Sequence, residues 1–343
     1  MRAMYLNEIT RLAENSTPLQ LVEVPRPNAG DGEILIRVAA CGVCHTELDE
    51  IEGRTPPAAL PIIPGHEVIG YVENIGAKVT RHKVGDRVGV GWIFAADGSE
   101  KENLSSSFVA TGRDVNGGYA EFMTVGQNYA FSIPKVFSDA EAAPLLCAGA
   151  VGYRALKMAG LNDGDSLGLT GFGGSGHLVM QLAKQLYPNS EILVFARSPA
   201  EQEFARELGA TWAGDIEAEP PRQLHAIIDT TPAWRPVLAS LGNLEPGGRL
   251  VINAIRKESA DRAVMAEIDY AAHLWMEKEL KTVANVTGDD IAEFLSVAAD
   301  IPLRPTVRTY PLERANAALC NLREGHIRGA NVLLMNSNHL ENN

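Results

Sequence analysis

The sequence predicts an α/β protein with a β-rich first part and a doubly wound parallel sheet after it. The first observation is a series of short, roughly alternating apolar runs separated by glycine and proline over residues 19–125. The second is a regular alternation of buried-strand and helix patterns that begins near Ala140. Short strands alone are typical of a barrel-like β domain, whereas strands that alternate with helices form a parallel sheet covered on both faces.

The β-rich part begins with strands at residues 19–24 and 33–39, which proline and glycine turns join. Residues 41–53 predict a short helix or loop. Further short strands are expected at residues 68–74, 87–91 and 120–125. Together these runs predict an all-β, barrel-like start.

The alternating part begins with a helix pattern at residues 142–159. Strands are then expected at residues 166–170, 191–196, 226–229 and 249–253, with helices at 177–186 and 199–208. The chain ends in helices near 289–299 and 312–324, a strand at 331–335 and a polar tail at 336–343. The alternation predicts helices on both faces of a parallel sheet.

Composition excludes several classes of protein. The net charge of −13 argues against nucleic-acid binding and against an anionic membrane surface. No apolar run approaches the roughly 18 residues of a membrane span, and the first residues do not form a signal peptide. Four cysteines in 343 residues make no disulfide framework, so we expect a cytoplasmic protein with thiols available for metal.

Metal-ligating side chains occur at three well-separated places. Cys44 lies in CGVCHTEL, His66 and Glu67 lie between glycines in PGHEVIG, and Cys147 follows LL. Two thiols and one imidazole suit the Cys2His set of an open catalytic zinc site. A redox pair of Cys41 and Cys44 is the alternative, but the thioredoxin-like context that it needs is absent.

A glycine-rich turn follows the strand at 166–170 and opens a helix. Its glycines are Gly171, Gly173, Gly174 and Gly176. In this context glycines allow close backbone approach to a dinucleotide pyrophosphate at the helix N-terminus. The alternative is a glycine-rich turn without a ligand.

The second strand of this part ends in Ala196-Arg197-Ser198 and offers no carboxylate to a ribose 2′-hydroxyl. A guanidinium and a hydroxyl suit a 2′-phosphate, so the sequence favours NADP over NAD. Arg197 as a solvated surface charge is the alternative.

These residues together resemble the zinc-containing medium-chain alcohol dehydrogenases. The resemblance covers nearly the whole chain through CGVCHTEL (41–48), GHEVIGYVENIG (65–76), VGDRVGVGW (84–92), GGYAEF (117–122), LLCAGAVGYRALK (145–157) and the 171–176 turn. It implies a GroES-like catalytic domain at 1–150 and 286–343, with a Rossmann cofactor domain inserted at 151–285.

The resemblance implies that Cys44, His66 and Cys147 ligate a catalytic zinc, with a fourth position open for water, alcohol or aldehyde oxygen. Glu67 would lie beside the metal. Glu47, where the family usually has Asp, would orient His66.

Four further roles follow from the resemblance. Thr46 would take the alcohol proton, and His45 would reach the cofactor pyrophosphate. Trp92 would line the substrate pocket, and Val151 would pack near the nicotinamide.

Two departures from the family pattern change these expectations. Residues 93–105 contain no cysteine, although family members usually carry four there for a structural zinc, so we expect one zinc per chain. The family's relay histidine is replaced by Asp49, so proton exit is expected through Asp49 or water.

The expected function is hydride transfer between a small, mainly apolar alcohol or aldehyde and NADP, with NAD as the other possible cofactor. The family implies a homodimer or homotetramer. A zinc-free quinone or enoyl reductase of the same superfamily, or a non-catalytic NADPH-binding protein, are the alternatives.

Overall fold

The computed structural model describes residues 1–325 and 328–335, which divide into two compact units. The first unit contains Met1–Cys147, Thr287–Ala299 and the chain from Pro305 onwards, and the second contains Ala148–Val286 and Asp300–Arg304. The tail predicted at residues 336–343 lies outside the described residues. None of the described helices is long and apolar enough to cross a membrane.

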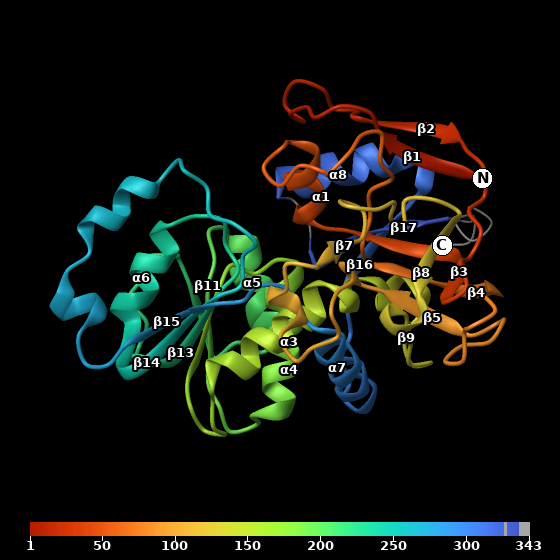
Figure 1. The fold of residues 1–343 in the computed structure, drawn as a ribbon. Coiled ribbons are helices and arrows are strands. Elements are labelled where there is room, and N and C mark those ends of the chain that lie inside the picture. The colour runs from red at the N-terminus through yellow and green to blue at the C-terminus, as the bar shows by residue number, and fades with distance from the viewer. Residues whose placement is uncertain (326–327, 336–343) are drawn as a thin grey trace. The chain divides into compact units, whose positions relative to one another are not determined.

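The first unit is built on a seven-stranded sheet in the order β16-β17-β3-β4-β5-β9, with β8 also paired to β3 (Figure 1). Its strands are β3 (Glu33–Val43), β4 (Val68–Ile75), β5 (Arg87–Val90), β8 (Phe122–Gly126), β9 (Phe131–Ser132), β16 (Val307–Pro311) and β17 (Ala330–Leu334). Two smaller pairs are β1 (Arg2–Leu6) with β2 (Leu19–Glu23) and β6 (Ile93–Ala95) with β7 (Val109–Ala110). The β-rich first part is therefore confirmed.

Strand β3 organises this sheet because its eleven residues pair with three other strands. Residues 33–37 pair with β8, residues 40–43 pair with β17, and β4 pairs along most of the strand. Ile34, Ile36 and Val38 alternate into the core and are at most 1% exposed. Their spacing of two residues places them on one face of the strand, and Leu35, which is 3% exposed, is buried on the other face.

The helices of the first unit are α1 (His45–Ile51), α2 (Asp139–Ala142), α7 (Gly288–Asp300) and α8 (Ala315–Glu324), with short 3-10 turns η1 (Glu102–Leu104), η2 (Gln127–Tyr129), η3 (Ala143–Leu146) and η6 (Leu312–Arg314). The expectation of one continuous helix at residues 142–159 is wrong. Pro144 lacks the N–H that a continuing α-helix needs, and Cys147 adopts φ −127°, ψ −77° before a new helix begins. Cys147 therefore lies between two helical segments, at the junction of η3 and α3.

The second unit contains a six-stranded, all-parallel sheet in the order β12-β11-β10-β13-β14-β15. Its strands are β10 (Leu167–Thr170), β11 (Ile192–Phe195), β12 (Trp212–Gly214), β13 (Leu224–Asp229), β14 (Leu244–Ile252) and β15 (Glu279–Thr282). Its helices are α3 (Ala148–Ala159), α4 (Gly174–Leu186), α5 (Pro199–Glu207) and α6 (Arg235–Asn243), with short turns η4 (Arg262–Glu267) and η5 (Tyr270–Leu274). The predicted doubly wound sheet is confirmed.

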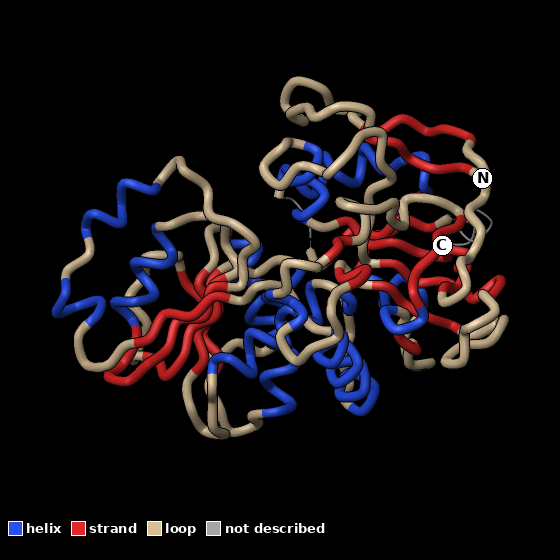
Figure 2. The backbone as a smooth tube through the Cα atoms, viewed as in Figure 1, coloured by secondary structure: helices blue, strands red, loops and turns tan. Residues whose placement is uncertain are grey.

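The chain first builds the sheet on one side of β10, through β11 and β12, and then crosses to the other side to form β13, β14 and β15. Helix α4 connects β10 to β11, whereas α6 connects β13 to β14 on the other side of β10. Because such crossovers are right-handed, the two helices cover opposite faces (Figures 1 and 2). The reversal of strand order beside β10 is where open α/β sheets bind ligands, at the carboxyl ends of the strands.

Candidate active site

The register of β3 and β4 brings the first two candidate ligands together. Cys44 directly follows β3, and His66 and Glu67 directly precede β4. The strands are antiparallel with Cys41 opposite Val68, so the end of one lies beside the start of the other. The N–H of Gly42 donates to the carbonyl oxygen of Glu67 at 2.9 Å and continues this pairing.

Glycines in and after β5 allow the third candidate ligand to approach. A Cβ on Gly89 would lie 2.7 Å from the side chain of Leu146, and one on Gly91 would lie 2.9 Å from its carbonyl oxygen. Since real Cβ atoms do not come this close, only glycine lets η3 pack here. Cys147 follows η3 directly and is thereby placed near the ends of β3 and β4.

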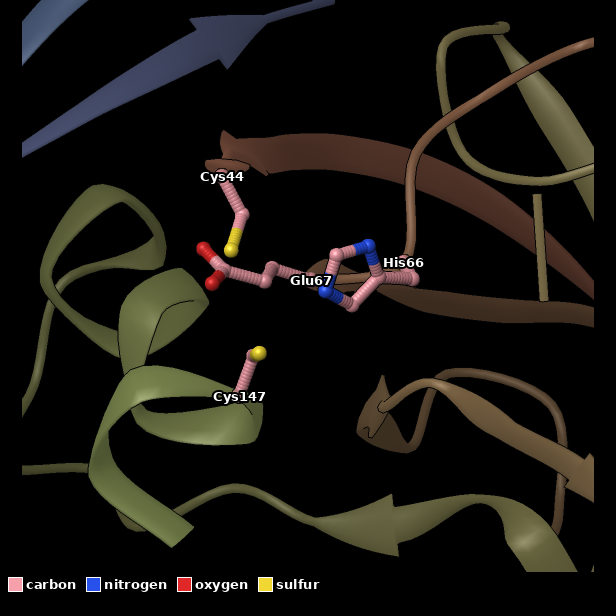
Figure 3. Close-up of side chains that lie close together, drawn as sticks. All are labelled: Cys44, His66, Glu67 and Cys147. Atoms are coloured by element: carbon pink, nitrogen blue, oxygen red, sulfur yellow. The ribbon is translucent and has the colours of Figure 1, made fainter. Parts of the chain in front are cut away.

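Four side chains from these places form one cluster. The ligand atoms of Cys44, His66, Glu67 and Cys147 all lie within 4.8 Å of one another. Figure 3 shows both sulfurs, the Glu67 carboxylate and one nitrogen of the His66 ring around a common space. Two ligands held by one tetrahedral zinc ion at about 2.0–2.3 Å stand about 3.5–4 Å apart, which the cluster accommodates.

Glu47 controls the orientation of this cluster. Its Oε1 lies 2.5 Å from Nδ1 of His66, and its Oε2 accepts a hydrogen bond from the backbone N–H of Cys44 at 2.8 Å. The other ring nitrogen of His66, Nε2, is buried and has no hydrogen-bond partner among the described residues. A buried nitrogen without a partner beside two thiols fits a metal ligand.

The cluster also perturbs the titration of its members. Contact with the Cys147 thiol lowers the pKa of Cys44 well below its usual value, and the same contact raises the pKa of Cys147. Burial lowers the pKa of His66, but the Glu47 carboxylate and the Cys44 thiol together raise it above its usual value. One thiolate is thus favoured at Cys44, and a thiolate is the form of cysteine that binds metal.

Glu67 can reach the cluster because Gly42 has no side chain. Glu67 is 2% exposed, and burial followed by the charge of Cys44 raises its pKa. A Cβ on Gly42 would lie 1.7 Å from Oε2 of Glu67. The sequence analysis did not single out Gly42, although its position between Cys41 and Cys44 was a signal.

Helix α1 carries three further candidates. The Thr46 hydroxyl is mostly buried and lies 3.6 Å from the sulfur of Cys44. The Asp49 carboxylate is buried and accepts a hydrogen bond from Nε of Arg54 at 2.6 Å. His45 is exposed.

The glycine-rich turn lies in the second unit, at the carboxyl end of β10. Gly171 has φ +82°, in the left-handed region that favours glycine. A Cβ on Gly176 would lie 2.6 Å from the carbonyl oxygen of Gly171, so the helix starts close against the strand. A Cβ on Gly173 would meet no heavy atom within 4 Å, so the turn is open there, and Gly174 is the first residue of α4. These features fit a pyrophosphate-binding turn.

The remaining cofactor candidates also lie in the second unit. Arg197 is exposed just beyond the end of β11. Ser198 caps α5, because its hydroxyl accepts from the N–H of Glu201 at 3.2 Å and donates to the Glu201 carboxylate at 3.0 Å. Val151 lies in the first turn of α3 and is half-buried. Of the pair after β11, Arg197 is therefore the side chain free to reach a phosphate.

Comparison with known proteins identifies this combination. Residues 30–135 match the family described as the alcohol dehydrogenase GroES-like domain. A probable alcohol dehydrogenase, AdhA, from Mycobacterium tuberculosis (strain CDC 1551 / Oshkosh) is 39% identical over 329 residues, with 93% of each chain covered. The chain belongs to the zinc-type medium-chain alcohol dehydrogenase family.

Two further similar proteins support this family assignment. An alcohol dehydrogenase from Geobacillus stearothermophilus is 33% identical, with 92% of this chain and 96% of the relative covered. The solved structure of a cinnamyl alcohol dehydrogenase from Sorghum bicolor is 26% identical with a TM-score of 0.80, covering 97% of this chain and 96% of that one. As a family member, the chain is an oxidoreductase of small-molecule alcohols or aldehydes that uses a nicotinamide cofactor.

In this alcohol dehydrogenase Trp92 lies near the cluster of candidate ligands, together with an acid that the sequence analysis missed. The ring centroids of Trp92 and His66 lie 6.4 Å apart, edge to face, and the Arg113 guanidinium lies 5.0 Å above the Trp92 ring. Glu50 is 1% exposed and lies 3.4 Å from the indole N–H of Trp92. Burial and then the charge of Glu47 raise the pKa of Glu50. Nothing in the local sequence distinguished Glu50 from an exposed helical acid.

Polar contacts hold the segment at 93–105, which contains no cysteine. The carboxylate of Glu102 accepts from the Gly288 N–H at 2.6 Å and from the Tyr129 hydroxyl at 2.9 Å. The Tyr129 oxygen in turn accepts from the N–H of Ala96 at 3.0 Å. One buried carboxylate thus joins this segment to η2 and to the start of α7.

Proposed function

We propose that this alcohol dehydrogenase is zinc-dependent and holds one zinc ion at Cys44, His66 and Cys147. The observation that carries the proposal is the buried, unpartnered Nε2 of His66, which Glu47 orients toward two thiols. A bound zinc ion supplies Lewis-acid polarisation of the reacting oxygen. Glu67, at the same cluster, is placed to approach the metal during ligand exchange.

We propose that side chains of helix α1 transfer the proton. We assign the alcohol proton to the Thr46 hydroxyl, which lies in the first turn of the helix next to Cys44. The proton then leaves through Asp49 or water, since Asp49 is three residues further along the same helix. Trp92 forms a wall of the substrate site, which favours a small, mainly apolar alcohol or aldehyde.

NADP is the proposed cofactor, with NAD as the alternative. The turn from Gly171 to Gly176 holds the pyrophosphate, with backbone N–H groups at the start of α4. Arg197 supports NADP because an exposed guanidinium stands where NAD-dependent enzymes present a carboxylate to the ribose. His45 and Val151 are assigned to the pyrophosphate and to the nicotinamide. We further propose a homodimer or homotetramer in the cytoplasm, a reducing compartment in which the free thiols remain available.

Metal analysis of carefully desalted protein tests this function, together with turnover of NADPH and NADH on small aldehydes. One zinc per chain and faster turnover with NADPH are expected. A zinc content near zero with the cofactor still bound would instead identify a zinc-free quinone or enoyl reductase. Two zinc ions per chain would contradict the assignment of residues 93–105, and cofactor binding without turnover would identify a non-catalytic NADPH-binding protein.

A further inference from the structure

Asn253 and the glycine-rich turn lie at the same edge of the sheet, where the parallel strands end. The register places Thr170 opposite Asp229 and Asp229 opposite Ile252, at the carboxyl ends of β10, β13 and β14. Gly171 directly follows Thr170, and Asn253 directly follows Ile252. Since neighbouring strands are about 4.8 Å apart, the two backbones lie roughly 10 Å from each other. The N–H of Asn253 donates to the carbonyl oxygen of Asp229 at 2.7 Å and holds this position.

The side-chain amide of Asn253 is buried without a partner. Both Oδ1 and Nδ2 are shielded from solvent, and neither forms a hydrogen bond within the described part of the chain. Buried polar groups in proteins are almost always paired, and here a donor and an acceptor on one side chain are both left over. Such an amide fits a ligand that offers one acceptor and one donor side by side.

The charged groups next to Asn253 are already engaged. Lys257 pairs with the carboxylate of Asp229, and its Nζ also donates to the carbonyl oxygens of Thr231 at 2.8 Å and Ala233 at 2.9 Å. The Asp229 carboxylate accepts in addition from the N–H and hydroxyl of Thr231. The Lys257 ammonium is thus bonded within the fold, whereas the Asn253 amide has no partner among the described residues.

The strand order indicates which part of the cofactor reaches Asn253. With the pyrophosphate at the turn after β10, the adenosine half extends over β11, where Arg197 lies. The nicotinamide half then extends the other way, over β13 and β14, whose ends carry Asp229 and Asn253. The nicotinamide carboxamide presents a carbonyl oxygen and an NH2 group, the complement of the Asn253 amide.

We propose that Asn253 is a positioning residue that binds the carboxamide of the nicotinamide. Nδ2 donates to the carboxamide oxygen, and Oδ1 accepts from its NH2 group, which fixes the rotation of the ring. This inference rests on the nicotinamide cofactor of the proposed function.

The test compares the Kd of NADP with that of its 3-acetylpyridine analogue, in which a methyl group replaces the carboxamide NH2. Binding is followed by quenching of tryptophan fluorescence in the whole protein. The wild type should bind NADP about tenfold more tightly than the analogue, the equivalent of one hydrogen bond. Asn253→Ala should weaken NADP binding about tenfold or more and reduce the preference over the analogue to near unity. The isosteric Asn253→Asp keeps the acceptor for the carboxamide NH2 group but loses the donor to the carboxamide oxygen, so it should weaken binding of both compounds and keep the preference for NADP.

Asn162→Ala is the matched control, because Asn162 precedes β10 at the opposite edge of the sheet and bonds to Asp165. Asn162→Ala should bind NADP and the analogue with the same affinities as the wild type. Equal binding of NADP and the analogue by the wild type, or an unchanged preference for NADP in Asn253→Ala, would overturn the inference. Failure of the wild type to bind either compound would instead contradict the proposed function.

Discussion

Oε1 of Glu47 lies 2.5 Å from Nδ1 of His66, and neither side chain is exposed to solvent. A carboxylate at Nδ1 holds the proton there and leaves the lone pair of Nε2 for a metal. The same carboxylate accepts from the backbone N–H of Cys44 through Oε2, so one acid orients two candidate ligands.

Replacing Glu47 tests this arrangement. Glu47→Gln keeps the size of the side chain but removes its charge, and we expect zinc affinity to fall about 10- to 100-fold. Competition with a chelator of known affinity measures the change. Glu52→Gln is the control, because Glu52 ends the same helix and pairs with Arg54 away from the cluster. Equal losses in both variants would contradict a specific role for Glu47.

Tyr129 and Glu102 should stabilise the 93–105 segment without metal. Burial and then the hydrogen bond to Glu102 raise the pKa of Tyr129 to about 12. Tyr129→Phe leaves the buried Glu102 carboxylate with one partner fewer and should lower the free energy of unfolding by about 1–3 kcal/mol. Zinc content should stay the same, and Tyr270→Phe, at an exposed tyrosine, should have little effect. A loss of zinc in Tyr129→Phe would show that this segment holds metal.

The pair of Lys257 and Asp229 should be essential to the second unit. Asp229 is fully buried, and Lys257→Met would leave its carboxylate without a counter-charge, at an expected cost of about 3–5 kcal/mol. Chemical denaturation measures this loss, and Asp229→Asn in the same chain should restore part of it. Lys278→Met is the control, since Lys278 donates to the carbonyl oxygens of Leu241 and Ala272. If Lys278→Met lowers the free energy of unfolding by as much, the unpaired Asp229 carboxylate is not the cause of the loss.

His177 should make the second unit sensitive to acid. Burial lowers its pKa from 6.5 to about 4, although the Gly173 carbonyl opposes this shift. As pH falls from 6.5 towards 4, the unfolded chain binds a proton that the folded chain excludes, so folding loses about 3 kcal/mol. His177→Gln should flatten this part of the stability profile. Parallel profiles for wild type and His177→Gln would refute the assignment.

The sequence determined the fold class because its signals are local. A period of two, a switch to strand-helix alternation and a glycine turn between β10 and α4 are each properties of a few neighbouring residues. The motifs around Cys44, His66 and Cys147 predicted a metal site for the same reason, since residue types and flanking glycines can be identified without coordinates. That these residues bind zinc stays a prediction, although the fold places them together.

Only the tertiary structure decided which other residues belong to the site. Gly42 is required because the Glu67 carboxylate occupies the space of its missing Cβ, and Glu50 is buried because α1 packs beside Trp92. The orphaned amide of Asn253 depends on the register of three strands. These contacts join residues far apart in the chain, and their distances follow from packing. Local patterns of residue type carry no such information, since they do not specify what a side chain will meet once the chain has folded.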